Sequence, residues 1–122
     1  MASLTRPVVI LASLLLWIRF AQAANLSAED AAKHVGETTT VCGNVASANY
    51  ASRSRGHPTF LDIDKAYPSS VFTVVIWGEN RSQFGSPETE LMGKRICATG
   101  VIELYRNRPE IIVSSPSQLH QE

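Results

Sequence analysis

Hydrophobic and polar residues alternate along five segments of the chain, a period-2 pattern typical of half-buried β-strands. The strands predicted in this way cover residues 38–51, 59–65, 71–77, 96–105 and 110–113. Residues 71–77 are almost all apolar, which predicts that this strand is the most buried. Gly43 interrupts the long first strand and indicates a bend or bulge at which the strand curls.

The segments between these strands contain residues that favour turns. Residues 53–58 and 66–70 are predicted loops, and residues 78–92 are a predicted irregular or briefly helical connection. A tight basic turn joins the last two strands. Asn107 lies at its tip, where a positive φ is tolerated, and Pro109 opens the final strand.

The first 23 residues have the pattern of a secretory signal peptide. A basic start is followed by an apolar run over 7–18 and by small residues at 21–23, where a signal peptidase would cleave. As a helix the apolar run would extend about 18 Å, which is shorter than the hydrocarbon core of a bilayer. A retained anchor is therefore the alternative. We expect export to the periplasm or secretion, with no stable membrane insertion after cleavage.

The charges of the chain are nearly balanced. It has 11 basic and 11 acidic residues, and removal of Arg6 and Arg19 with the signal peptide leaves nine basic residues against 11 acidic ones. Such a chain has no general attraction to nucleic acid or to anionic lipid. Any binding of anions must come from local clusters.

Cys42 and Cys97 are the two cysteines of the chain. An even pair in an exported protein predicts a disulfide. Neither cysteine lies in a Cys-x-x-Cys motif, and two cysteines alone make a poor zinc site, so no metal is expected.

Five strands in about 75 residues, with a long bent first strand, predict a mainly β chain that closes into a small Greek-key barrel. A β-sandwich usually needs about seven strands. In such a barrel the first and fourth strands are antiparallel neighbours, which would place Cys42 and Cys97 on one face within disulfide reach. The expected organisation is a signal peptide over 1–23, a short N-terminal helix over 24–36, the barrel over 37–115 and a flexible tail over 116–122.

The chain resembles small bacterial exported OB-fold domains, which also occur as modules attached to secreted nucleases and are related to the tRNA-anticodon-binding type. The resemblance covers roughly residues 36–119, and Asn107 stands where the family pattern would have glycine. The segments that carry the resemblance are VCGNV at 41–45, PTFLDI at 58–63, FTVVIW at 72–77, GKRICATG at 93–100 and YRNRPEIIV at 105–113. The resemblance implies a five-stranded Greek-key OB-fold barrel.

The resemblance also implies a place for a ligand. OB-folds bind across strands two and three, between the loops that join strands one to two and four to five. Here these two loops are the most basic segments, which favours single-stranded nucleic acid held by phosphate contacts and base stacking. The expected ligand-binding residues are Arg53, Arg55, His57, Phe60, Tyr105, Arg106 and Arg108, with Tyr50 and Trp77 as further stacking candidates.

Other interpretations stay open at this point. The arginines can be solvated loop tips, and the aromatic residues can cover the ends of a barrel. Asp62 and Asp64 resemble a paired-carboxylate site, but we expect them to be solvated strand residues. No motif of a catalytic site is present, so we expect no enzyme, no catalytic residue and no cofactor. The alternative function is binding of another anionic ligand, an oligosaccharide (glycan) or a protein partner at the same face.

Overall fold

The computed structural model describes residues 3, 5, 7 and 24–122. The predicted signal peptide over 1–23 therefore lies outside the described residues, apart from three single positions. Within the described part of the chain, no helix has the length and apolar character needed to cross a membrane.

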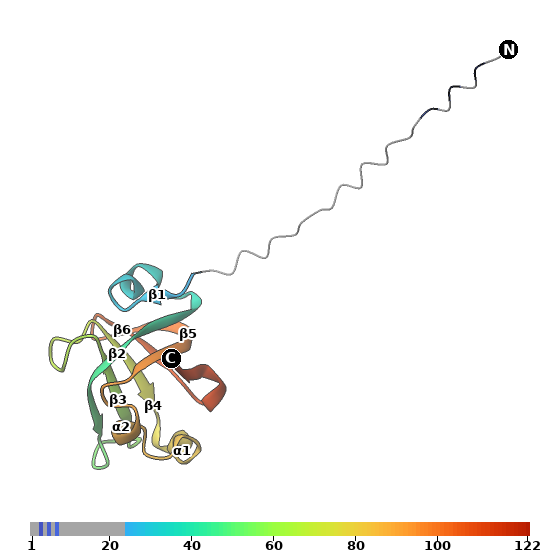
Figure 1. Ribbon diagram of the computed structural model, residues 1–122. Helices are drawn as coiled ribbons and strands as arrows, with labels where there is room; N and C mark the ends of the chain where they lie inside the picture. Colours follow the sequence, from blue (N-terminus) through green and yellow to red (C-terminus); the bar gives the residue numbers. More distant parts are fainter. Residues whose placement is uncertain (1–2, 4, 6, 8–23) are drawn as a thin grey trace.

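Five strands close into a barrel (Figure 1). The neighbour order is β2-β3-β4-β6-β5, and pairing of β5 with β2 completes the ring. All these pairs are antiparallel except β4 with β6, which is parallel. This confirms the predicted fold class, a mainly β five-stranded OB-fold barrel. The strands are β2 (Thr38–Tyr50), β3 (Thr59–Ile63), β4 (Phe72–Ile76), β5 (Arg95–Tyr105) and β6 (Arg108–Ile112).

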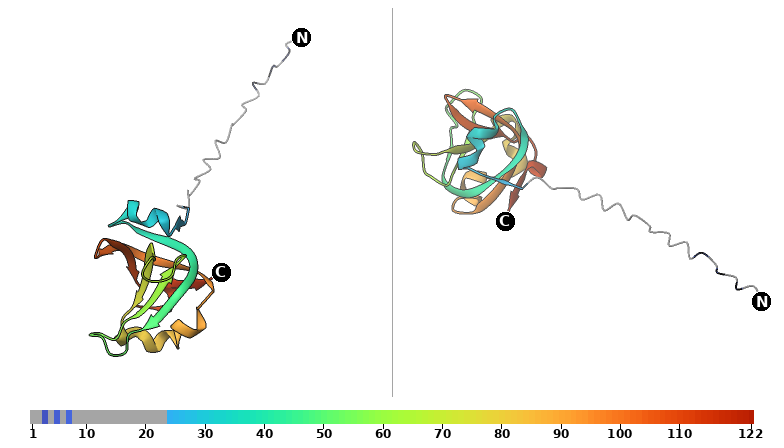
Figure 2. Two further views of the ribbon diagram at one scale, coloured as in Figure 1. Left: turned by 90° about the vertical axis from the view of Figure 1, so that its left-hand side faces the viewer. Right: turned by 90° about the horizontal axis from the view of Figure 1, so that it is seen from above.

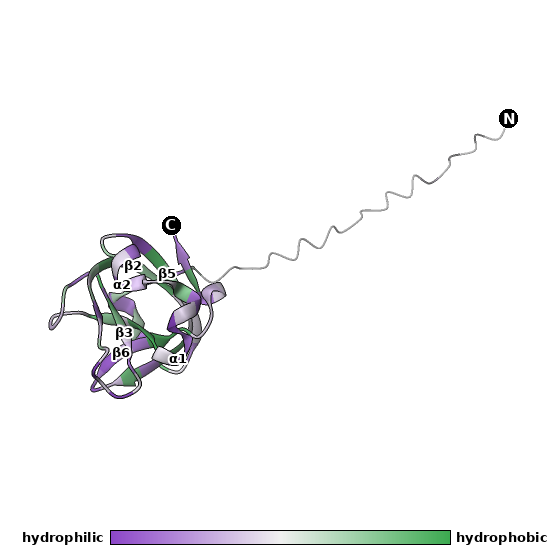
Figure 3. Cartoon of the chain, turned by 90° about the horizontal axis from the view of Figure 1, so that it is seen from below, coloured by the Kyte–Doolittle hydropathy of each residue, from purple (hydrophilic) through white to green (hydrophobic). Residues whose placement is uncertain are grey.

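The alternating apolar residues of the strands fill the interior of the ring. Figure 3 shows the ring from below, with the chain coloured by hydropathy. Ile102 and Leu61 are completely buried, as the strand pattern predicts. Leu104 has the same parity as Ile102, yet it is exposed because it lies near the end of β5, next to the turn. The barrel interior contains Val41, Val45, Leu61, Ile63, Phe72, Val74, Ile76, Ile96, Ala98, Ile102, Ile111 and Val113.

Short helices lie at the two ends of the barrel (Figure 2). The 3-10 helix η1 (Glu29–His34) is at one end, where Ala31 is fully buried in the core. At the other end, Phe84 and Leu91 pack against the core from the connection between β4 and β5. That connection contains α1 (Gly78–Arg81), the 3-10 helix η2 (Ser82–Phe84) and α2 (Pro87–Glu90).

Both chain ends differ from the prediction. In place of a helix over 24–36, the chain forms β1 (Leu26–Ser27), parallel to β2, and then the shorter η1. In place of a flexible tail over 116–122, it forms the 3-10 helix η3 (Pro116–Gln118) and β7 (Leu119–Gln121). β7 is antiparallel to β5 and pairs with Ile96, Cys97 and Ala98. The tail is ordered because its backbone groups complete the hydrogen bonding at this edge of β5.

The long strand β2 curls and therefore pairs with two different strands. Its first half, up to Asn44, pairs with β5, and its second half pairs with β3. A register shift between Val45 and Ser47 marks the bulge. The bulge therefore lies beyond Gly43, the predicted position, which stays in register with Ile96. Glycine at 43 has a packing reason, because a Cβ atom there would lie 2.3 Å from Ile63 Cγ2. Only glycine allows β2 to pass this close to β3.

The predicted disulfide is confirmed. Cys42 and Cys97 are direct partners in the β2–β5 ladder, with Cα atoms 4.0 Å apart and an S–S bond of 2.05 Å. The bond links two residues 55 positions apart in the sequence.

Candidate ligand-binding groove

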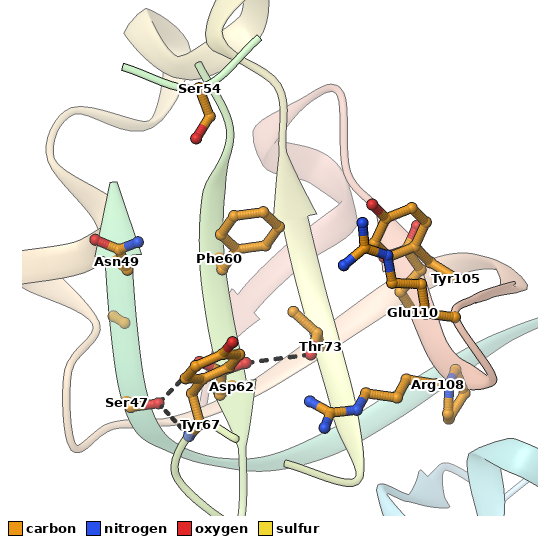
Figure 4. A pocket seen from close by; sticks show the side chains of 13 residues that line it. Ser47, Asn49, Ser54, Phe60, Asp62, Tyr67, Thr73, Tyr105, Arg108 and Glu110 are labelled. Atoms are coloured by element: carbon orange, nitrogen blue, oxygen red, sulfur yellow. Dashed lines mark hydrogen bonds between the residues drawn. The ribbon is translucent and has the colours of Figure 1, made fainter. Parts of the chain in front are cut away.

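A cavity of about 870 Å³ that opens to solvent lies on the outer face of the barrel, over β2, β3, β4 and β6 (Figure 4). We call it the groove. It lies on the face where OB-folds bind ligands. Its lining comprises Ser47, Ala48, Asn49, Ser54, Phe60, Asp62, Tyr67, Thr73, Tyr105, Arg106, Arg108, Pro109 and Glu110.

Strand register arranges the outer side chains of the barrel in rows. One row is polar and crosses all five strands, because each member is the ladder partner of the next. Its members are Ser47, Asp62, Thr73, Glu110 and Glu103. The neighbouring row is Asn49, Phe60, Val75 and Ile112. The groove lining takes four residues from the polar row, Ser47, Asp62, Thr73 and Glu110, and two from its neighbour, Asn49 and Phe60. The remaining members, Glu103, Val75 and Ile112, lie outside the lining.

Asp62 is the deepest carboxylate of the groove, with 5% of its surface exposed. The Ser47 hydroxyl donates to its Oδ2 atom at 2.8 Å, and the Thr73 hydroxyl donates to its Oδ1 atom at 3.2 Å. Asp64 lies beyond the end of β3 and accepts a hydrogen bond from the Asn44 backbone at 2.9 Å. The expectation that Asp62 is a solvated strand residue is wrong. Its carboxylate is buried, and hydroxyl groups from β2 and β4 supply its hydrogen bonds in place of water.

Three aromatic side chains line the groove. Phe60 is half-buried and lies between Asn49 and Tyr105 in Figure 4. Tyr105 is 55% exposed and Tyr67 is 74% exposed. The backbone N–H of Tyr67 donates to the Ser47 hydroxyl at 3.0 Å, which fixes its turn beside the groove. Sequence reasoning missed Tyr67, although an aromatic residue in an otherwise polar turn was a usable signal.

Arg106 and Arg108 line the groove from the β5–β6 turn. Arg106 and Asn107 both have positive φ, 50° and 63°, as in the two-residue turns that connect tight hairpins. This confirms the expectation for Asn107 and adds Arg106. The Arg106 guanidinium lies 5.3 Å from the centre of the Tyr105 ring, within the range of a cation–π contact. Arg108 donates to the Pro68 carbonyl oxygen at 2.6 Å and so connects this turn to the turn that carries Tyr67.

The other predicted basic residues lie in the β2–β3 loop. Arg53, Arg55 and His57 are all exposed, and only Ser54 of this loop lines the groove. The loop is held in place, since His57 Nδ1 lies 2.7 Å from the Ser52 carbonyl oxygen and the Gly78 N–H donates to the Gly56 carbonyl at 2.9 Å. The structure thus brings Phe60, Tyr105, Arg106 and Arg108 together in the groove, and places the three loop residues outside its lining.

The two further stacking candidates have other neighbours. Tyr50 lies under the Arg81 guanidinium, which is 3.8 Å from the ring centre. The Trp77 ring packs so closely on the β2–β3 loop that a Cβ atom at Gly56 would lie 2.9 Å from it. Neither residue lines the groove.

Glu110 is half-buried on the wall of the groove. Burial raises the pKa of its carboxyl above the ordinary value, and the charge of Glu103 raises that pKa further. Sequence reasoning missed this carboxylate because its position depends on register with β4 and β5.

Among the described residues, one cluster brings together side chains that can bind metals: Cys42, Cys97 and Glu122. The two sulfurs are bonded to each other and offer no thiolate, so the cluster has no metal-binding chemistry.

Comparison with solved structures supports the fold. A putative aspartyl-tRNA synthetase from Leishmania major Friedlin matches 86% of this chain with a TM-score of 0.59 and 9% identity. The match spans 22% of the synthetase chain. The OBody AM1L10, solved bound to hen egg-white lysozyme, matches 84% of this chain and 96% of its own, with a TM-score of 0.55 and 15% identity. At these identities the likeness concerns the fold alone.

No protein-family model matches the sequence, and no curated protein matches it.

Proposed function

We propose that this protein binds single-stranded nucleic acid in the groove. The observation that carries the proposal is the juxtaposition of exposed and half-buried aromatic rings with two arginines along one face of the barrel. Stacking on aromatic rings accepts any base, and guanidinium groups contact the phosphates between bases. Phe60, Tyr67 and Tyr105 are the stacking residues, and Arg106 and Arg108 are the phosphate contacts.

Hydrogen bonds that fix the walls of the groove support this assignment. The fixed β2–β3 loop and the bond from Arg108 to the Pro68 carbonyl hold the walls of the groove in place before a ligand arrives. Binding to such a groove loses less conformational entropy than binding to a mobile one. One of the structures with a similar fold is a putative tRNA synthetase, but the proposal depends on the groove and not on that likeness.

We further propose that the protein is exported and that it is a binding protein without catalytic activity. A disulfide supports an oxidising compartment, the periplasm or the exterior. Asp62, the most buried carboxylate of the groove, has both oxygens occupied by hydroxyl donors, so it is assigned to structure and not to acid–base chemistry.

The test is a fluorescence-anisotropy titration of the oxidised protein, residues 24–122, with a labelled oligothymidylate of about eight nucleotides. Two phosphate contacts predict a slope of log affinity against log salt of about −1.4. Arg106→Gln/Arg108→Gln should abolish most of that slope and weaken binding at low salt. Arg53→Gln/Arg55→Gln removes the same charge from a loop outside the lining and should change affinity much less. Absence of binding at low salt would overturn the proposal.

A neutral oligosaccharide is the second candidate ligand. One observation favours it: the charges of Asp62 and Glu110 formally balance those of Arg106 and Arg108, so the groove as a whole is not strongly basic. Aromatic rings beside polar acceptors also suit a sugar, and OB-folds bind oligosaccharides as well as oligonucleotides. Affinity for neutral hexasaccharides that does not depend on salt, together with no affinity for oligothymidylate, would favour this candidate.

A further inference from the structure

Glu110 and Asp62 lie in the same row of the groove but differ in how their oxygens are used. Both oxygens of Asp62 accept hydrogen bonds from neighbouring hydroxyls. The Glu110 carboxylate accepts no hydrogen bond from any residue that the structure describes, although Glu110 is half-buried and lines the groove. A partly desolvated carboxylate without donors is costly, and a ligand that supplies donors relieves that cost.

The position of Glu110 suits the edge of a base and not a phosphate. It is the ladder partner of Thr73 on β4, while Phe60 on β3 is the partner of Val75, two residues further along β4. Two strand spacings and an offset of two residues along β4 separate the backbones of Phe60 and Glu110 by about 12 Å across the groove. Tyr105 lies two residues along β5 from Glu103, the ladder partner of Glu110, and Figure 4 shows Phe60 on the other side of β4 from Tyr105 and Glu110. A base that stacks on either ring can therefore turn its edge toward Glu110. A phosphate at the same place would be repelled by the carboxylate.

We propose that Glu110 makes the groove selective for guanine. The Watson–Crick edge of guanine carries two adjacent donors, N1–H and the N2 amino group, which match the two oxygens of a carboxylate. Thymine and uracil offer a single donor between two carbonyl oxygens that the carboxylate repels. Cytosine and adenine offer an amino group beside an unprotonated ring nitrogen. Guanine alone supplies the paired donors, and a bidentate contact of this kind separates bases by about tenfold in affinity.

This inference rests on the proposed function, and the experiment separates the two. Oxidised protein is titrated with labelled oligothymidylate of about eight nucleotides and with the same strand carrying one central guanine or one central hypoxanthine. Hypoxanthine keeps N1–H and lacks the N2 amino group. The wild type should bind the guanine strand about tenfold more tightly than the thymine strand, with the hypoxanthine strand between them.

Two matched variants isolate the carboxylate. Glu110→Gln should reduce the guanine preference to near onefold while the protein still binds oligothymidylate. Glu103→Gln removes the same charge one strand away, from a residue outside the groove lining, and should keep the preference. Equal affinity of the wild type for the three strands would overturn the guanine assignment and leave the proposed function standing. A preference that survives in Glu110→Gln would overturn it as well, whereas failure to bind any of the strands would overturn the proposed function itself.

Discussion

Glu103 and Glu110 lie directly opposite each other on the antiparallel strands β5 and β6. Like charges in this arrangement destabilise a sheet. Burial of Glu110 and, as the smaller cause, the charge of Glu103 raise the pKa of the Glu110 carboxyl above the ordinary value of 4.5. The pair is therefore a local cost to the folded barrel, located at the edge of the groove.

Glu110→Gln should stabilise the protein at neutral pH by about 0.5 kcal/mol, because it removes the repulsion and the buried charge. The folded state binds the proton of Glu110 more tightly than the unfolded state does. Stability therefore falls as pH rises from about 4.5 through the raised pKa, and the benefit of the substitution should disappear below pH 4.5. Urea unfolding at pH 7 and pH 4 measures both quantities.

Glu103→Gln is the control for this prediction, since it removes the repulsion while Glu110 keeps its burial. It should stabilise the protein less than Glu110→Gln does, and the double variant should gain less than the sum of the two. A loss of stability in Glu110→Gln at pH 7 would show that the carboxylate contributes a favourable contact instead.

The strands were predictable from sequence because alternation is a local signal. The predicted strand 38–51 corresponds to Thr38–Tyr50, and 59–65 corresponds to Thr59–Ile63. The ends of the chain were not predictable in this way. β7 has only three residues, and it forms because β5 offers an unpaired edge that no local pattern reveals.

The groove was only partly predictable. Phe60, Tyr105, Arg106 and Arg108 could be expected there because the resemblance to OB-folds gives the binding face. The burial of Asp62 depends on hydroxyls from Ser47 and Thr73, which lie 15 and 11 residues away in the sequence. Cross-strand register brings such groups together, and a single sequence does not specify it residue by residue.

The disulfide should contribute much of the stability of this small barrel. In the loop-closure model, a bond between residues 55 positions apart stabilises by about 4 kcal/mol. Cys42→Ala/Cys97→Ala should therefore lower the urea midpoint strongly. Reduction of the wild type with dithiothreitol should lower it by a similar amount and should leave the double variant unchanged. A midpoint within error of the wild type would contradict this expectation.

Gly43 should be far less tolerant of substitution than Gly36. A Cβ atom at Gly43 would lie 2.3 Å from Ile63 Cγ2, so Gly43→Ala must push β2 and β3 apart and should cost about 3 kcal/mol. Gly36 has a φ of 89° but open space around it, and Gly36→Ala should cost about 1 kcal/mol from backbone strain. Thermal unfolding of the two variants gives the comparison, and equal losses would show that β2 adapts to the added methyl group.

The ion pair between Arg81 and Glu88 should hold the helical connection at its end of the barrel. Arg81 Nη2 lies 2.5 Å from Glu88 Oε1, and each side chain is about one-fifth exposed. The guanidinium also covers the Tyr50 ring. Arg81→Met should cost about 2 kcal/mol, because it removes both contacts and leaves a largely buried carboxylate without its partner.

A double-mutant cycle tests whether this pair acts as a unit. Arg81→Met, Glu88→Gln and their combination should show a coupling of at least about 1 kcal/mol in urea unfolding. The pair of Arg95 and Glu122, 2.6 Å apart and about half exposed, serves as the control and should couple by no more than about 0.5 kcal/mol. Additive losses at Arg81 and Glu88 would contradict the prediction, because they would mean that the two side chains contribute independently and that Arg81 acts through its contact with Tyr50. Because none of these residues lines the groove, oligonucleotide affinity of the folded variants should match that of the wild type.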